Sequence, residues 1–140
     1  MSSDSLRSVS LLRTAPSRYL ATNPRGGELP MGDGSTAEFT PVELLLAAVA
    51  GCSAVDVDLL TSRLAEPDAF ELSASGRKVR DEGGNHLESV EVHFTVRFPA
   101  GEDGDRAGER LPSAVAMSRD RLCTVSRTVA LPVPVVFHLD

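Results

Sequence analysis

The sequence predicts a single α+β domain spanning residues 1–140, because helical and strand patterns are segregated along the chain rather than alternating. Three observations support this prediction. A long apolar helix begins near Pro41, strand alternation covers residues 90–98, and turn signals divide the first third into short strands. A chain of 140 residues is long enough to bury a core of its own.

The first third of the chain consists of short strand patterns separated by turn residues. We expect strands over 8–12, 18–22 and 28–31, with a turn at 23–27, where Asn, Pro and Gly cluster. A polar, glycine-bearing loop then opens at residues 32–35.

The clearest expected element is the helix that follows this loop. Thr40 is a natural N-cap, Pro41 suits the first helical position, and Glu43 completes a capping box. The helix is expected to continue to about Leu64, before Pro67. Its middle is apolar almost all the way round, so we expect it to be buried on most sides. A domain of this size cannot easily cover such a helix alone, which favours an obligate homodimer.

The sequence after this helix predicts a β-hairpin, a second helix and a final strand. Strands are expected over 69–79 and 90–98, with a hairpin turn at 81–85. Residues 99–108 are expected to form an acidic loop, and Pro112 to start a second helix that continues to about Leu122. Cys123 then falls where this helix ends or bends, and 131–139 is expected to form a proline-interrupted edge strand.

Charge and hydropathy argue against several classes of partner. The net charge is −6 with a single lysine, so no basic surface for nucleic acid is expected. The uncharged run over 44–55 is too short to cross a bilayer, and the N-terminus lacks the order of a signal peptide, so no membrane association is expected. A soluble, cytoplasmic protein is the expectation. No nucleotide-binding glycine motif is present, and we expect no cofactor.

The only two cysteines are the candidate functional residues. In a reducing cytosol they are expected to be either inert core residues or redox-active ones. Cys52 lies on an apolar stripe at helical spacing, so periodicity alone favours a core role and a raised thiol pKa; the stripe contains Leu45, Ala48, Val55 and Leu59. A reactive Cys52 therefore needs a cation from outside its helix, which has no Lys or Arg before Arg63. Cys123 has three arginines close by in sequence, which favour a thiolate: Arg119, Arg121 and Arg127.

Two other chemistries receive little support. The cysteines are 71 positions apart and the three histidines are not clustered, so the spacing predicts no metal site. A Cys–His hydrolase would need His93 or His138 as its base. The first is on the polar face of a strand, and the second is two residues from the end.

Residues 39–57 and 122–128 together resemble segments of the OsmC/Ohr family of osmotically inducible and organic hydroperoxide resistance proteins. Residues 39–57, FTPVELLLAAVAGCSAVDV, resemble the central helix of that family. Residues 122–128, LCTVSRT, resemble its second cysteine segment. The order and separation of the segments also match, and the resemblance covers nearly the whole chain.

The resemblance implies an intertwined α+β homodimer with both cysteines at the subunit interface. It implies that Cys52 attacks an organic hydroperoxide and that Cys123 resolves the sulfenic acid as a disulfide, which a dithiol or dithiol protein then reduces. Hydrogen peroxide is a further candidate substrate. A low-polarity pocket around Cys52, formed by residues such as Leu45 and Val55, would favour alkyl hydroperoxides.

Two positions depart from the family pattern. Family peroxidases carry a glutamate directly after the helix-opening proline, where this chain has Val42. Glu43 follows one place later, in a branch with a Pro-x-Glu-Leu pattern, and is either catalytic or only a helix cap. The family's activating arginine best matches Arg25, with Arg18 as the second candidate.

These departures leave two interpretations. The first is a dithiol peroxidase that uses Cys52, Cys123, Arg25 and Glu43 in oxidative-stress defence. The second is a non-catalytic dimeric member that acts as a redox sensor or small-molecule-binding protein. Asp56, one helical turn after Cys52, would oppose thiolate formation unless an arginine pairs with it.

Overall fold

The computed structural model describes residues 5–140 and divides the chain into two compact units within helix α1 (Pro41–Thr61). The first unit ends at Leu45, and the second spans Leu46–Asp140. Antiparallel sheets and segregated helices confirm the predicted α+β class. The assignment of the whole chain to one domain stays a prediction.

The first unit contains a three-stranded antiparallel sheet in the order β1-β2-β3. Its strands are β1 (Ser10–Ala15), β2 (Arg18–Thr22) and β3 (Glu28–Gly32), close to the predicted ranges. Asn23 closes the turn after β2, because its Oδ1 accepts hydrogen bonds from the backbone N–H groups of Arg25 (3.0 Å) and Gly27 (2.9 Å).

Helix α1 begins with the predicted capping box. The backbone N–H of Thr40 donates to Glu43 Oε1 at 2.8 Å, and that of Glu43 donates to Thr40 Oγ1 at 3.2 Å. The helix ends at Thr61, three residues before the predicted end, and a turn follows over residues 62–64.

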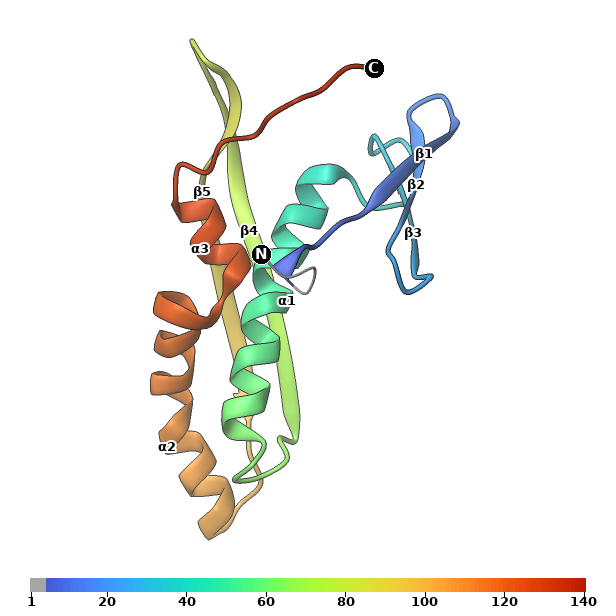
Figure 1. Ribbon diagram of the computed structural model, residues 1–140. Coiled ribbons are helices and arrows are strands. Elements are labelled where there is room, and N and C mark those ends of the chain that lie inside the picture. Colours follow the sequence, from blue (N-terminus) through green and yellow to red (C-terminus); the bar gives the residue numbers. More distant parts are fainter. Residues whose placement is uncertain (1–4) are drawn as a thin grey trace. The chain divides into compact units, whose positions relative to one another are not determined.

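The second unit contains a long antiparallel hairpin, formed by β4 (Ala69–Asp81) and β5 (Gly84–Arg97). Figure 1 shows α1 and the second long helix, α2, running along this hairpin. Exposed and half-buried residues alternate along β5, as the sequence pattern predicts. Gly84 closes the turn at φ +116°, a backbone conformation that other residues rarely adopt.

Helix α2 (Glu102–Met117) corrects the prediction of a loop over residues 99–108 and a helix starting at Pro112. Acidic residues in the first turn complement the helix dipole. Gly104 allows close packing, since a Cβ there would overlap the carbonyl oxygen of Pro99. Pro112 lies inside the helix, at the cost of one backbone hydrogen bond. Gly104, which resembled a loop signal, therefore has a packing role in the helix, and Pro112 lies within the helix instead of starting it.

Beyond α2 the chain forms a π-helical turn, η2 (Ser118–Leu122), and then a short helix, α3 (Thr124–Ala130). Cys123 separates the two with an extended backbone, so the predicted break at this residue is confirmed. The predicted strand over 131–139 is wrong, because this segment is irregular. A strand needs a partner for its backbone groups, and none pairs with this segment among the residues described.

The core of the second unit is narrow. One stripe of α1 is buried at four-residue spacing, formed by Val49, Ser53, Val57 and Thr61. Buried residues of α2 and η2 are small: Gly104, Ala107, Ala114 and Ser118. The expectation that α1 is buried on most sides is wrong for the single chain, where Val55 is 61% exposed and Leu59 is 58% exposed. By length and composition alone α1 could also cross a membrane, as many core helices of soluble proteins could.

Candidate functional site

The fold brings the two cysteines together although they are far apart in sequence. The Sγ atoms of Cys52 and Cys123 and a carboxylate oxygen of Asp56 all lie within 4.8 Å of one another. Cys52 and Asp56 are one turn apart on α1, so their side chains share a face of the helix. Cys123 comes from the junction between η2 and α3. Neither cysteine is in a disulfide.

Ser118 links the two sides of this cluster. Its side-chain hydroxyl donates a hydrogen bond to Asp56 Oδ2 at 2.8 Å. Its carbonyl oxygen accepts from the backbone N–H of Cys123 at 2.9 Å. Ser118 is fully buried and Asp56 is half-buried, so the hydrogen bond to Asp56 is partly shielded from water. One residue of the π-helical turn therefore fixes Asp56 and Cys123 relative to each other.

Cys123 is fully buried and caps helix α3. The backbone N–H of Ser126 donates to its Sγ at 3.3 Å, and the hydroxyl of Ser126 lies 3.2 Å from the same sulfur. Burial acts to raise the pKa of the Cys123 thiol, but hydrogen bonds from Ser126, Cys52 and Ser53 outweigh it and lower that pKa. Cys123 is thus the more acidic thiol of the pair.

Cys52 has the opposite electrostatic environment. Burial is the largest influence and raises the pKa of its thiol. A hydrogen bond from the Val125 backbone is the next influence and lowers this pKa, whereas the neighbouring Cys123 and, least of all, the charge of Asp56 raise it. Cys52 is only partly buried, however, so it is the more accessible sulfur. The lower thiol pKa therefore favours Cys123 as the nucleophile, whereas solvent exposure favours Cys52.

The arginines near Cys123 do not cause its acidity. Arg119 pairs with Asp120 at 2.8 Å, and Arg127 donates to the Asp120 carbonyl oxygen at 3.4 Å. The pKa of the Cys123 thiol is lowered by hydrogen bonds to its sulfur and not by the nearby arginines that the sequence suggested. Within residues 46–140 the described ion pairs also leave Asp56 without an arginine.

The remaining predicted site residues belong to the first unit. Arg25 is exposed in the turn after β2, and Arg18 pairs with Glu38 at 3.4 Å. Glu43 is exposed at the start of α1, where it forms the capping box. The cap explains Glu43 structurally, while its catalytic role and that of Arg25 stay predictions.

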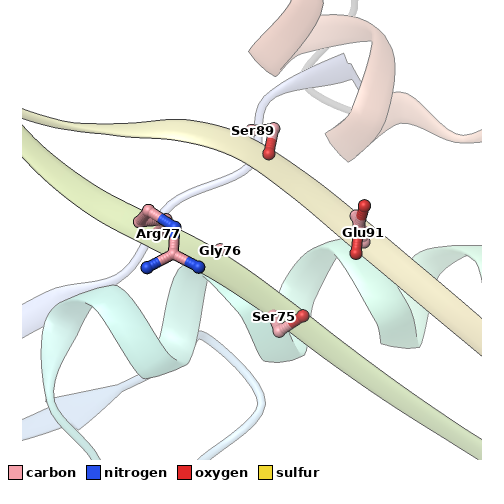
Figure 2. A pocket seen from close by; sticks show the side chains of 5 residues that line it. All are labelled: Ser75, Gly76, Arg77, Ser89 and Glu91. Carbon is pink, nitrogen blue, oxygen red and sulfur yellow. The ribbon is translucent and has the colours of Figure 1, made fainter.

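Two shallow hollows lie at residues other than the cysteines. The one in Figure 2, of about 350 Å³, is open and mostly polar and sits on the β4–β5 hairpin. It is lined by Ser75, Gly76, Arg77, Ser89 and Glu91. The other, of about 780 Å³, belongs to the first unit and includes Arg25. Neither hollow is lined by a thiol.

The serines that support the cysteines were not among the residues predicted from the sequence. Ser126 follows Cys123 by three positions, the spacing at which an N-cap side chain meets a backbone N–H, so a capping pattern could have revealed it. Ser118 had no comparable signal, because its partner Asp56 is 62 positions away. The apolar stripe of Leu45, Ala48, Val55 and Leu59 is exposed in the single chain, and the pocket expected from it stays a prediction.

The fold and the site together describe an α+β protein in which a long helix holds one cysteine sulfur within 4.8 Å of a second. The OsmC-like protein family model matches residues 32–138, and the chain belongs to this family. It is 29% identical to the uncharacterized protein Rv2923c of Mycobacterium tuberculosis, with 84% of each chain covered.

Solved structures share the fold. A hypothetical protein from Aquifex aeolicus aligns with a TM-score of 0.72 at 23% identity, with 89% of this chain and 87% of that chain covered. A Legionella pneumophila structure described as an organic hydroperoxide resistance protein OsmC aligns at 0.60 and 15% identity, with 89% and 90% covered.

The capping box predicts different effects for two substitutions of Glu43. Glutamine can still accept the Thr40 hydrogen bond, so Glu43→Gln should leave the free energy of unfolding nearly unchanged. Glu43→Ala removes that acceptor and should lower it by roughly 0.5–1.5 kcal/mol in urea denaturation. If Glu43 is also catalytic, the glutamine variant will consume hydroperoxide more slowly than the parent. An unchanged rate would contradict the catalytic role.

Asp56 predicts a shift in the reactivity of Cys52. The carboxylate helps to raise the pKa of the Cys52 thiol, so Asp56→Asn should lower that pKa and keep an acceptor for Ser118. The pH midpoint of Cys52 alkylation by iodoacetamide, followed by peptide mass mapping in metal-free buffer, should move to lower pH. Asp58→Asn, at an exposed position of the same helix, is the matched control and should leave the midpoint in place.

Proposed function

We propose that this protein is a thiol-dependent peroxidase that reduces organic hydroperoxides through a Cys52–Cys123 disulfide. The supporting observation is the pairing of a partly exposed thiol with a buried thiol whose sulfur lies within 4.8 Å. The name of the Legionella structure, a hydroperoxide resistance protein of the same fold, points to the same substrate class.

The proposed reaction has three steps. The Cys52 thiolate attacks the terminal peroxide oxygen, the O–O bond breaks, and the alkoxide leaves and takes a proton to become the alcohol. Cys52 is then a sulfenic acid. The Cys123 sulfur attacks the sulfenic sulfur and expels water, which forms the disulfide. A dithiol or dithiol protein reduces that disulfide and restores both thiols.

Solvent exposure decides which of the two cysteines reacts first with the hydroperoxide in this proposal. Cys123 is fully buried, so a bulky hydroperoxide reaches Cys52 first. The lower pKa of the Cys123 thiol suits the second step, in which its thiolate attacks the oxidised Cys52. The sulfurs must then approach to about 2.05 Å. Cys123 lies at a junction between two short helical segments, where such a movement disturbs little regular structure.

Activation of Cys52 requires a cation under this proposal. Burial and Asp56 both raise the pKa of the Cys52 thiol, and a guanidinium near the sulfur would lower it. We assign this role to Arg25, with Arg18 as the second candidate. Glu43 would orient the arginine in addition to capping α1.

The exposed apolar surface supports a homodimer rather than a membrane protein. Val55 and Leu59 on α1 are mostly exposed. The C-terminal segment exposes further apolar side chains, including Val135, Phe137 and Leu139 at 77%, 91% and 99%. A second copy would cover both surfaces and supply hydrogen-bond partners for the backbone of residues 134–139.

Mass spectrometry after peroxide treatment tests the roles of the cysteines. One equivalent of an alkyl hydroperoxide should remove two hydrogens from the reduced protein and link Cys52 to Cys123. Cys123→Ser should instead accumulate a sulfenic acid at Cys52 that a carbon nucleophile traps. Cys52→Ser should react far more slowly.

Two outcomes would contradict these roles. A sulfenic acid on Cys123 in the Cys52→Ser variant, formed at the parental rate, would reverse the order of the thiols. A parent protein that stays reduced at stoichiometric peroxide would end the peroxidase proposal and favour a sensor or a small-molecule-binding protein.

The dimer proposal is tested by light scattering coupled to size exclusion. The expected mass is twice that of the 14.9 kDa chain. Leu59→Lys should shift the protein to monomer, because it places a charge on the exposed apolar side of α1. Thr95→Lys, at an exposed position of β5, adds the same single positive charge and should stay dimeric. A parent that remains monomeric over a wide concentration range would refute the dimer.

A further inference from the structure

Cys52, Asp56 and Cys123 together have the composition of a metal site, although their spacing in sequence gives no sign of one. Two thiols and one carboxylate converge, and each offers one ligand atom. The geometry points to a site for a thiophilic divalent ion, which we assign as Zn²⁺ held by these three side chains. This inference concerns binding and does not rest on the proposed peroxidase activity.

The distances suit such an ion after a small contraction. With Zn–S bonds of about 2.3 Å and Zn–O bonds of about 2.1 Å, tetrahedral ligand atoms lie roughly 3.5–3.8 Å apart. The three ligand atoms lie within 4.8 Å of one another before any ion is present. The required movement of the ligand atoms is therefore on the order of 1 Å.

The ligand types select among metals. Thiolates disfavour Mg²⁺ and Ca²⁺, which prefer oxygen donors throughout. A carboxylate is a poor ligand for Cu⁺, whereas Zn²⁺ accepts sulfur and oxygen together. Three protein ligands leave the fourth tetrahedral position to water.

The surroundings also resemble those of a metal site. Ser118 donates to Asp56 Oδ2 from a fully buried position, and this hydrogen bond orients the carboxylate as outer-shell partners of metal ligands do. Cys123 is fixed through its backbone N–H by the same serine. Cys52 and Asp56 are the partly exposed ligands, whereas Cys123 is buried. An ion could therefore enter from the side of Cys52.

Zinc bound here would occupy both thiols. Where the proposed peroxidase activity holds, zinc should protect the protein from oxidation, because the Cys52 thiolate is no longer free to attack a peroxide. Zinc binding and disulfide formation then become mutually exclusive states of one site.

The experiment uses reduced full-length protein under anaerobic conditions. Co²⁺ titration should produce thiolate-to-metal charge-transfer absorption and the visible bands of tetrahedral cobalt, saturating at one ion per chain. Zn²⁺ should displace the cobalt. Isothermal titration with Zn²⁺ should give the same stoichiometry.

Variants assign the ligands. The double variant Cys52→Ser/Cys123→Ser should lose the charge-transfer band and the zinc affinity. Asp56→Asn should weaken zinc binding at least tenfold, and Ser118→Ala should weaken it roughly tenfold through the outer shell. The matched control, Asp58→Asn, should bind as the parent does. Circular dichroism of each variant establishes that it is folded.

Three outcomes would overturn the inference. Reduced parent protein that binds no Zn²⁺ at micromolar concentration would refute the site. Binding that survives in the cysteine-free variant would locate the ion elsewhere. Binding that depends on the cysteines but is unchanged in Asp56→Asn would refute the three-ligand arrangement. Each measurement is made without peroxide, so an inactive peroxidase leaves the result interpretable.

Discussion

The hydrogen bond between Ser118 and Asp56 is the interaction on which the arrangement of the site depends. It joins the middle of α1 to the π-helical turn η2 across 62 positions of sequence. Cys52 lies one turn before Asp56 on the helix, and the Cys123 backbone is bonded to the same serine. A regular α-helix through Ser118–Leu122 would rotate Cys123 to a different direction, since π-helical turns hold more residues per turn. The irregular turn is thus part of how the two sulfurs meet.

The position of the site between core and surface explains the contrast between its two thiols. Cys123 is buried but caps a helix, so backbone and hydroxyl donors stabilise its thiolate. Cys52 is nearer to solvent but shares its helix face with a carboxylate, which opposes a second negative charge. One negative charge is therefore easily held by the pair, and a second is not. Chemistry that begins at Cys52 needs either a cation or the transfer of the charge from Cys123 to Cys52.

Local signals in the sequence were sufficient for most of the fold but not for the site. The capping box of α1, the turn at Asn23 and the alternation of β5 depend on neighbouring residues, and the structure confirms all three. The first part of helix α2, before Pro112, was missed because Gly104 has a packing role that only the tertiary structure reveals. The family resemblance predicted that the two cysteines act together. The apolar periodicity predicted that the stripe containing Cys52 is buried, whereas Val55 and Leu59 on that stripe are exposed. Ser118 could not be predicted, because its function arises from a contact between distant segments.

The way in which the exposed face of α1 is covered also affects the reactivity of the Cys52 thiol. The buried stripe of α1 ends at the edge where Cys52 lies, and beyond that edge Val55 and Leu59 meet solvent. Cys52 precedes Val55 by three positions on the helix, so a partner that covers Val55 would lie beside Cys52 and influence which cations, peroxides or metal ions reach its sulfur. Covering this face with apolar surface alone would raise the pKa of Cys52 still further. A partner that both buries α1 and permits thiol chemistry must therefore bring, or leave room for, a positive charge beside Cys52.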